Sequence, residues 1–562
     1  MKILSLHCDY IKFQAKKKAI KDAEKTTEKE IQVKEPLVIL TAVEKNDEKN
    51  IKEISEKLTK EIKDIAKQVN AKNIVLYPYA HLSKNLASPQ KALEILKATE
   101  KLLTKEFKVT RAPFGFYKSF ELRCKGHPLS ELSREITIEK EAEEKYNSGQ
   151  LLREISKTRL DREKLKENDH RIIAQQLKLF SFSETAPGMV FWHPKGLIIR
   201  NELIDFWREE HEKAGYQEIS TPMILDKRLW QISGHWEKYR ENIFLTEYDK
   251  RTFAVKPMNC PGGILVYKSE LRSYKDFPLR ISELGIVHRQ ELSGVLGGIF
   301  RVIQFIQDDA HIYCTEEQLE EEINHVIELV NKIYSTFSFK YSIELSTRPE
   351  KRIGEDKIWE KAELALENVL KKRNIKFKTN KGEGAFYGPK IDFHIQDSLG
   401  RKWQCGTIQI DFSMPERFDL TYEGKDGKKH KPVMIHRAIY GSLERFIGIL
   451  LENFSGKLPL WLNPNQVKII TVNDRNNKFS EEIFRRLKNE NIRVELDSRN
   501  ETISRKVRDA QLEKFNYVVT IGDKEENNKK LAVRTRGGEV KFDVDMNEFI
   551  EGIKEEINKR SI

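Results

Sequence analysis

The sequence is poor in cysteine and lacks any long apolar run. Only five cysteines (Cys8, Cys124, Cys260, Cys314 and Cys405) are spread over 562 residues. An odd, widely spaced set excludes a disulfide framework and favours a reducing compartment. No uninterrupted apolar stretch approaches the roughly 20 residues that a membrane-spanning helix needs, and the apolar N-terminal stretch is too short for a signal peptide. We therefore expect a soluble cytoplasmic protein without a membrane partner.

The sequence also lacks a strong excess of one charge. Lys and Arg number 100 and Asp and Glu 88, interspersed along the chain, which leaves a net charge of +12. This excess suits a polyanionic partner such as nucleic acid, but a low-GC or heat-adapted source explains it equally well. The chain is too long for a single core and predicts three or four domains.

Composition and periodicity divide the chain into four segments. Residues 1–140 alternate strand-like and helix-like stretches and predict a compact α/β unit. Residues 141–180 are charged, poor in aromatics and helical in propensity, as in a solvated linker. Residues 181–462 hold most of the glycine, proline, tryptophan and histidine and end at a proline-marked break. Residues 463–562 alternate strand and helix and predict a small parallel-sheet α/β domain.

Cys260 lies in an unusual setting, the stretch KPMNCPGG. A cysteine kept for packing usually lies in an apolar run. Here Pro257 and Pro261 restrict the backbone, and Gly262 and Gly263 permit close approach of another chain segment. This pattern indicates that the thiol is held in place for a chemical role.

A second candidate site lies in the β-rich stretch 299–314. Side chains two apart in a strand share a face, so Phe305, Gln307, Asp309 and His311 are expected on one side. A ring, an amide, a carboxylate and an imidazole do not make an apolar core face. The alternative is a half-exposed strand with chance polar residues.

Arg289 and Glu291 in GIVHRQE are also two residues apart and are expected to share one strand face. Such a pair suits a phosphate together with a cation or amine, although an ordinary salt-bridged face is the more common case.

These stretches resemble the motifs of class II aminoacyl-tRNA synthetases. PLRISELGIVHRQE followed by FRVIQFIQDDAH resembles motif 2, which implies that Arg289 binds the ATP α-phosphate and that Phe305 stacks on adenine. VMIHRAIYGSLERFIGIL resembles motif 3, which implies that Arg445 reaches the γ-phosphate. Ser442 and Arg445 are three apart and are expected on one helical face. QEISTPMILDKRLW, around Pro222, resembles motif 1 of the dimer interface and implies a homodimer.

Within that class the chain resembles the threonyl-tRNA synthetase family. SGHWEKYRENIF, KPMNCPGG, QDDAHI, GAFYGPKIDF, WQCGTIQIDFSMPERF and VMIHRAIYGSLERF follow the family's order over residues 180–460. The departures are Gly263 where a histidine often follows CPG, HRQE in place of HRNE, and QFIQDDAH in place of GFTQDDAH. The central domain is therefore expected to be a class II antiparallel-sheet catalytic domain.

The resemblance implies a zinc site and the substrate contacts around it. The zinc ligands would be Cys260, His311 and His436, which leaves a fourth position open for substrate. Asp309 would accept the proton of the threonine hydroxyl, and Tyr387, Lys390 and Gln404 would line the threonine pocket. Gln307 and Glu291 would contact ATP, which brings Mg²⁺. The threonine carboxylate would attack the α-phosphate while Arg289 and Arg445 stabilise the developing charge.

This zinc site separates threonine from valine but not from serine. Valine lacks the hydroxyl that the metal would bind, whereas serine lacks only one methyl. One methyl gives a discrimination of about 10- to 200-fold. A separate editing site is therefore expected.

The N-terminal segment resembles the editing domain of archaeal threonyl-tRNA synthetases, which has a D-aminoacyl-tRNA deacylase-like fold. The resemblance implies that His81, Tyr117, Lys118 and Glu131 line a pocket that hydrolyses seryl-tRNA, with Lys118 positioning water or the ester. Aromatic neighbours predict a partly desolvated Lys118 with a lowered pKa, although a simple strand lysine is more common.

The C-terminal segment resembles the anticodon-binding domain of the same family. That resemblance implies contacts from Asn500, Glu525 and Arg534 to unstacked anticodon bases of the threonine tRNA. Two other functions stay open: a catalytically silent paralogue that binds tRNA or mRNA as a regulator, and a zinc-dependent hydrolase. The presence of Arg289, Arg445 and all three proposed ligands speaks against the first. Two phosphate-binding arginines have no role in the second.

Overall fold

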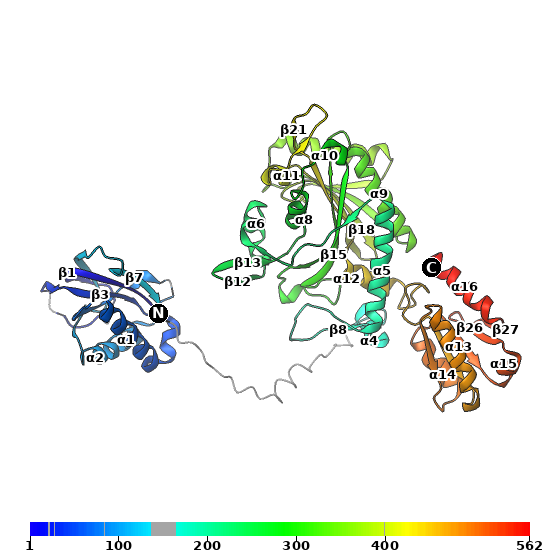
Figure 1. Cartoon of the computed structure of the whole chain (residues 1–562), viewed down its shortest axis with the longest axis horizontal. Helices are drawn as coiled ribbons and strands as arrows, with labels where there is room; N and C mark the ends of the chain where they lie inside the picture. Colours follow the sequence, from blue (N-terminus) through cyan, green and yellow to red (C-terminus); the bar gives the residue numbers. More distant parts are fainter. Residues whose placement is uncertain (21–22, 27–28, 84, 137–164, 398–399) are drawn as a thin grey trace. The chain divides into compact units, whose positions relative to one another are not determined.

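A computed structural model describes residues 1–20, 23–26, 29–83, 85–136, 165–397 and 400–562 (Figure 1). The chain forms two compact units, Met1–Asn147 and Ser148–Ile562. Most of the expected helical linker, residues 141–164 of 141–180, lies outside the described residues. Its described end carries helix α4 (His170–Leu177). No helix in the described part of the chain is both long and apolar enough to cross a membrane.

The N-terminal unit is a seven-stranded sheet with the order β2-β1-β3-β4-β5, in which β6 and β7 also pair with β1. Helices α1 and α2 cover one face of this sheet (Figure 1). The elements are β1 (Lys2–Lys18), β2 (Ile31–Lys34), β3 (Pro36–Ala42), α1 (Ile51–Gln68), β4 (Asn73–Pro78), η2 (Ala80–Leu82), α2 (Pro89–Leu103), β5 (Lys108–Arg111), β6 (Phe116–Cys124) and β7 (Glu131–Glu135).

The periodicities of the sequence explain these elements. In α1 the buried residues Ile54, Leu58, Ile62 and Ile65 recur at helical spacing and pack against the sheet. Strand β3 is buried along its whole length, as its continuous apolar run predicts. The next strand is shorter than expected, because β4 ends at Pro78 and the following residues form the 3₁₀ helix η2.

The second unit is built on an eight-stranded sheet with the order β10-β14-β15-β22-β19-β18-β16-β17. Neighbours are antiparallel except β10 with β14 and β16 with β17. The strands are β10 (Gln217–Glu218), β14 (Leu279–His288), β15 (Gln304–Cys314), β16 (Tyr341–Ser346), β17 (Phe377–Asn380), β18 (Lys390–Gln396), β19 (Lys402–Asp411) and β22 (Val433–Ser442).

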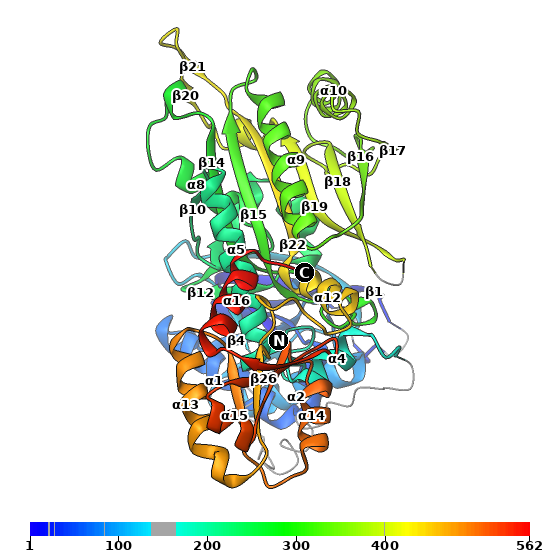
Figure 2. The same cartoon turned by 90° about the vertical axis from the view of Figure 1, so that its right-hand side faces the viewer.

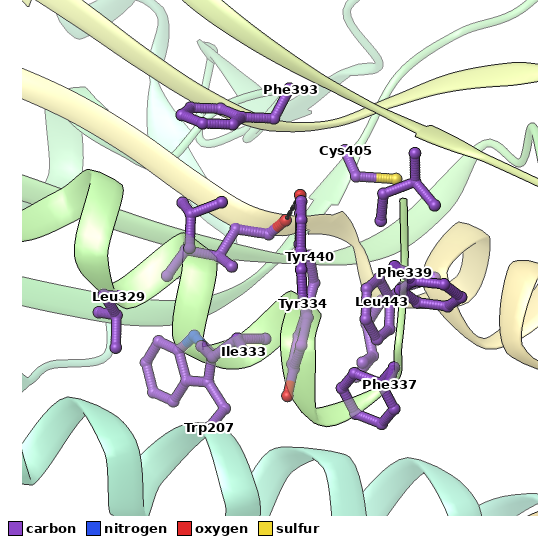
Figure 3. Packing of buried hydrophobic residues seen from close by; sticks show 14 of the residues in the cluster. Trp207, Leu329, Ile333, Tyr334, Phe337, Phe339, Phe393, Cys405, Tyr440 and Leu443 are labelled. Carbon is purple, nitrogen blue, oxygen red and sulfur yellow. Dashed lines mark hydrogen bonds between the residues drawn. The ribbon is translucent and has the colours of Figure 1, made fainter. Parts of the chain in front are cut away.

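Long helices cover one face of this sheet, and Figure 2 shows α9 lying across its strands. The helices around the sheet are α5 (Pro194–Lys213), α8 (Cys260–Tyr267), α9 (Leu319–Thr336), α10 (Asp356–Lys372) and α12 (Leu443–Asn453). Apolar side chains of α5, α9, α10 and α12 form the largest core, in which the Tyr334 hydroxyl donates to the Ile439 carbonyl at 2.7 Å (Figure 3). On β15, Ile312 and Cys314 join this core.

Smaller elements complete the central region. They are β8 (Phe180–Ser181), β9 (Phe191–Trp192), β11 (Ile224–Asp226), α6 (Lys227–Ile232), α7 (His235–Tyr239), β12 (Leu245–Tyr248), β13 (Arg251–Val255), α11 (Ser413–Arg417), β20 (Tyr422–Glu423) and β21 (Lys429–His430).

The C-terminal domain has a mixed sheet with the order β24-β23-β25-β26-β27. The three predicted strands are parallel, but two further strands, β26 and β27, add antiparallel pairs that the sequence interpretation missed. The elements are β23 (Val467–Thr471), α13 (Asn477–Asn489), β24 (Val494–Asp497), α14 (Ile503–Leu512), β25 (Tyr517–Ile521), α15 (Asp523–Asn528), β26 (Leu531–Thr535), β27 (Val540–Val544) and α16 (Met546–Asn558).

Candidate active site

One cavity of about 680 Å³ opens on the sheet face that α9 does not cover. Strand β15 contributes Phe305, Gln307 and Asp309 to its wall, as expected from their shared strand parity. Every other proposed threonine and ATP contact also lines it, namely Arg289, Glu291, Tyr387, Lys390, Gln404, Ser442 and Arg445. Residues that are far apart in the sequence therefore meet in a single site.

Cys260 and His436 line this cavity, and His311 lies beside them. Their ligand atoms all lie within 4.8 Å of one another, and all three residues are buried. His311 and His436 face each other across the β15–β22 pair, and Cys260 is the first residue of α8. The sheet register and the helix start thus bring the three together.

The chemistry of these donors fits a metal ion. His311 Nε2 is buried and has no hydrogen-bond partner among the described residues. His436 Nε2 lies 2.9 Å from Asp411 Oδ2, so its Nδ1 is left for a ligand, an arrangement typical of metal-bound histidine. Burial raises the pKa of the Cys260 thiol well above its usual value and lowers the pKa of His311 well below its own. The imidazole is therefore neutral, as a metal ligand requires, and a bound cation would deprotonate the thiol.

Asp309 lies beside the three donors. Its Oδ1 is 3.8 Å from His311 Nε2, and its Oδ2 accepts from the Asn259 amide at 3.3 Å. Burial raises the pKa of Asp309 to about 6. The carboxylate thus lies next to the three candidate metal donors.

The opposite wall is held by a carboxylate that the sequence interpretation missed. Asp392 is buried, and its Oδ2 lies 2.8 Å from Lys390 Nζ. Its Oδ1 accepts from the Gln404 amide at 2.5 Å. The Tyr387 hydroxyl donates to Gln409 at 2.7 Å. Asp392 follows Lys390 by two residues, so the two side chains share a strand face. This spacing is the sequence signal that could have identified Asp392.

Arg289 and Glu291 also line the cavity, but they do not lie on a strand. Strand β14 ends at His288, so the expectation that both lie on one strand face is wrong. The Arg289 guanidinium lies 5.2 Å from the centre of the Phe305 ring. Glu291 pairs with Arg301 at 2.8 Å, a third arginine of the cavity wall that the sequence interpretation did not select.

Ser442 and Arg445 also differ from expectation. Ser442 ends β22 and caps α12, and its hydroxyl accepts from the Arg445 backbone N–H at 3.2 Å, so the two do not share a helical face. The Arg445 side chain donates to the carbonyls of Phe300 and Gln404, each at 2.9 Å. These contacts hold the guanidinium in the cavity wall.

A buried carboxylate fixes a bulge in β22 that precedes Ser442. Between the pairs Gln307–Ser442 and Asp309–Ala438 the β15–β22 register shifts, so that three residues of β22 face the single residue Asp308. The Asp308 carboxylate accepts from the backbone N–H groups of Ile439, Tyr440 and Gly441 at 2.8 to 3.2 Å. Burial raises the pKa of Asp308 to about 6.

In the N-terminal unit, Lys118 lies on β6 in a partly desolvated position. Its ammonium donates to the Pro113 and Phe116 carbonyls at 3.1 and 3.2 Å and lies 5.0 Å from the Tyr77 ring centre. Burial lowers the pKa of Lys118 to about 8. Tyr77 contacts Tyr79, whose ring lies 5.4 Å from that of His81. An aromatic ladder thus connects Lys118 with His81.

The other two predicted editing residues do not join this cluster within one chain. Tyr117 is the neighbour of Lys118 on β6, so its exposed ring points to the opposite face of the strand. Glu131 pairs with Leu6, whereas Lys118 pairs with Ala15, nine positions further along β1. Nine residues of strand correspond to roughly 30 Å.

The predicted anticodon contacts fall into two groups. Asn500 is exposed in the loop after β24, and Glu525 lies in α15 after β25, where its carboxylate accepts from the Gly522 N–H at 3.0 Å. Both follow the carboxyl ends of parallel strands. Arg534 lies on the antiparallel strand β26 opposite Val518, near the start of β25, and is therefore toward the other end of the sheet.

Comparison with known proteins assigns each domain. Residues 1–136 match a family described as the Archaea-specific editing domain of threonyl-tRNA synthetase. Residues 244–454 match the tRNA synthetase class II core domain (G, H, P, S and T), and residues 466–556 match an anticodon binding domain. These matches confirm the predicted three-domain architecture.

Curated relatives include the threonine–tRNA ligases of Carboxydothermus hydrogenoformans, 55% identical over 398 residues, and Clostridium tetani, 53% identical over 400. Each match covers 71% of this chain but only 63% of the relative's own length.

Two solved structures are also similar. The RNA binding domain of threonyl-tRNA synthetase from Cryptosporidium parvum Iowa II matches with a TM-score of 0.67 and 39% identity, over 69% of this chain and 98% of that one. The putative threonyl-tRNA synthetase ThrRS-1 from Aeropyrum pernix matches with a TM-score of 0.62 and 29% identity, over 70% and 97%. Together with the domain matches, these likenesses show that the chain belongs to the threonyl-tRNA synthetase family.

Proposed function

We propose that the protein ligates L-threonine to its tRNA through a threonyl-adenylate and clears mischarged seryl-tRNA in its N-terminal unit. One observation carries the proposal. Cys260, His436 and the Asp309 carboxylate line the same cavity as two arginines suited to ATP, and His311 completes a buried Cys–His–His donor set beside them. The first group suits an amino acid with a hydroxyl, and the second suits a triphosphate, so the cavity brings the two substrates of adenylation together.

The chain's own residues supply the adenylation step. Arg289 beside Phe305 suits an α-phosphate next to a stacked adenine, and Arg445 suits the γ-phosphate. ATP enters with Mg²⁺, and Glu291 and Gln307 contact the nucleotide. The threonine carboxylate then attacks the α-phosphorus, the bond to the bridging oxygen breaks and pyrophosphate leaves, while both guanidinium groups stabilise the developing negative charge. No protein nucleophile takes part.

Threonine is selected by the candidate metal donors and the residues around them. Cys260, His311 and His436 would hold Zn²⁺, which supplies open coordination positions for the substrate amine and hydroxyl. Asp309 accepts the hydroxyl proton, and Tyr387, Lys390 and Gln404 surround the rest of the amino acid. Valine leaves the hydroxyl position unfilled, but serine differs by one methyl only. That small difference is the reason for a second, hydrolytic site.

In the N-terminal unit, Lys118 and His81 are the residues that support hydrolysis of seryl-tRNA. The Lys118 ammonium is fixed by two carbonyls and an aromatic face, which suits it to orient an ester or a water molecule. Tyr117 and Glu131 complete the proposed editing set, and Asn500, Glu525 and Arg534 the anticodon contacts. The working form is proposed to be a cytoplasmic homodimer that pairs through the region around Pro222.

Threonine-dependent exchange of pyrophosphate into ATP tests the proposal. Zinc-loaded protein should catalyse exchange with threonine, weakly with serine and not measurably with valine. A regulatory paralogue would bind tRNA without exchange, and a zinc hydrolase would show no dependence on ATP. Absence of threonine-dependent exchange in zinc-replete protein contradicts the proposal.

A further inference from the structure

Asn259 is a buried amide that contacts the proposed hydroxyl acceptor. It is 0% exposed, and its Nδ2 donates to Asp309 Oδ2 at 3.3 Å. Among the described residues no other side chain donates a hydrogen bond to Asp309. The second carboxylate oxygen, Oδ1, is the one nearest to His311 Nε2. The amide therefore engages one oxygen and leaves the other turned toward the metal donors.

The backbone fixes where this amide lies. Asn259 directly precedes Cys260, and its carbonyl accepts from the Gly263 N–H at 3.1 Å at the start of α8. The residue that contacts Asp309 is thus the chain neighbour of the thiol ligand. A displacement of this loop would move the thiol and the amide together.

Gly285 on β14 makes the room that the amide occupies. A Cβ at position 285 would lie 2.0 Å from Asn259 Oδ1, 2.3 Å from Cγ and 2.4 Å from Nδ2. Atoms cannot approach so closely, and a fully buried side chain has no open space to move into. Glycine at this strand position is explained by the amide, since the residue is paired in regular register with Gln307.

We propose that Asn259, seated against Gly285, is a positioning residue for amino acid selection: it orients Asp309 so that Oδ1 accepts the substrate hydroxyl proton. The inference rests on the proposed function, because it assigns the residue that aims the hydroxyl acceptor of that site. Without the amide, the buried carboxylate loses its donor and can rotate away from the metal donors. Binding of threonine then weakens, whereas ATP, whose proposed contacts do not include Asp309, is unaffected.

The test compares Asn259→Ser, Gly285→Ala and the double variant with wild type in zinc-loaded full-length protein. Loss of a hydrogen bond to a charged group corresponds to about 10- to 100-fold in affinity. Each single variant should raise the KM for threonine by about this factor and lower the threonine-to-valine ratio. The KM for ATP and the zinc content should stay unchanged. The double variant should resemble Asn259→Ser alone, because Asn259→Ser removes the amide that Gly285→Ala would displace.

Matched controls separate this role from general damage to the fold. Asn465→Ser removes another buried asparagine, which lies in the C-terminal domain, and Gly552→Ala adds a methyl where nothing lies within 4 Å. Both should retain wild-type threonine selection. Asp309→Asn, as the direct comparison, should show at least the defect of the Asn259 variant.

Three outcomes overturn the inference. In the first, Asn259→Ser keeps the wild-type threonine KM and valine ratio while Asp309→Asn changes both. In the second, the variants lose zinc, which would show that Asn259 only supports the ligand loop. In the third, the effects of the two singles multiply in the double variant. If wild type itself shows no threonine-dependent exchange, the proposed function fails instead. Calorimetric binding of threonine and valine to zinc-loaded protein then still tests the role of Asn259.

Discussion

Replacing Asp308 with asparagine should impair ATP use while leaving the fold largely intact. Asp308 accepts from three consecutive backbone N–H groups and so holds the bulge in β22 that precedes Ser442. Ser442 caps α12 and thereby positions Arg445. Asparagine keeps one carbonyl oxygen but turns an NH₂ group toward at least one of these donors. The bulge in β22 must then shift to relieve the contact between the NH₂ group and the backbone N–H.

Two terms of similar size decide the effect on stability. Leaving a buried N–H without an acceptor costs about 1 to 3 kcal/mol. Burial raises the pKa of Asp308 from 3.8 to about 6, so the ionised form costs about 3 kcal/mol at neutral pH, and the neutral amide avoids this cost. The terms oppose each other, so we expect the melting temperature to change by only a few degrees. A displacement of Arg445 by about 1 Å is enough to lower the rate by about 100-fold.

Pyrophosphate exchange at varied ATP, together with scanning calorimetry, measures both effects. Asp545→Asn is the matched control, since Asp545 also accepts from two backbone N–H groups but caps α16 in the C-terminal domain. Asp308→Ala, which removes every acceptor, should instead destabilise the central domain strongly. The reasoning is refuted if Asp308→Asn exchanges pyrophosphate within twofold of wild type at all ATP concentrations.

Three further predictions concern other parts of the chain. Burial raises the pKa of Glu444 from 4.5 to about 7, so the native state holds this proton more tightly than the unfolded state. The free energy of unfolding should therefore fall by about 3 kcal/mol between pH 4.5 and 7. Glu444→Gln should flatten this part of the pH–stability curve, and an unchanged slope contradicts the assignment. Lys118→Ala should keep threonine charging but accumulate seryl-tRNA, and wild-type clearance should decline as pH rises through 8, because the fixed ammonium loses its proton; clearance at the wild-type rate in the variant would exclude Lys118. Cys260→Ser should lower the zinc content measured by atomic absorption, and chelation should abolish threonine-dependent exchange until zinc is restored; full zinc occupancy in the variant would remove Cys260 from the ligand set.

The structure separates the four predicted editing residues. Lys118 and His81 meet through aromatic rings, but Tyr117 and Glu131 lie elsewhere on the same unit. For Tyr117 the sequence contained the warning, because strand alternation sends the neighbours Tyr117 and Lys118 to opposite faces. The position of Glu131 depends on the pairing register along β1, which the sequence does not show.

The sequence by itself determined several of the elements and the chemical types at the site. Helical spacing in α1, strand parity in β15 and the proline-bounded stretch around Cys260 each follow from local rules of backbone and side-chain geometry. The order of the motifs along the chain identified the family. These signals are local, so one sequence is sufficient to find them.

Only the tertiary structure decided which distant residues act together. The β15–β22 register sets His311 against His436, and the shift in that register gives Asp308 three backbone donors. The contact of Asn259 with Asp309 likewise depends on the absence of a side chain at Gly285, on a different strand. Register and close packing join segments far apart in the chain, and no local pattern encodes such distances.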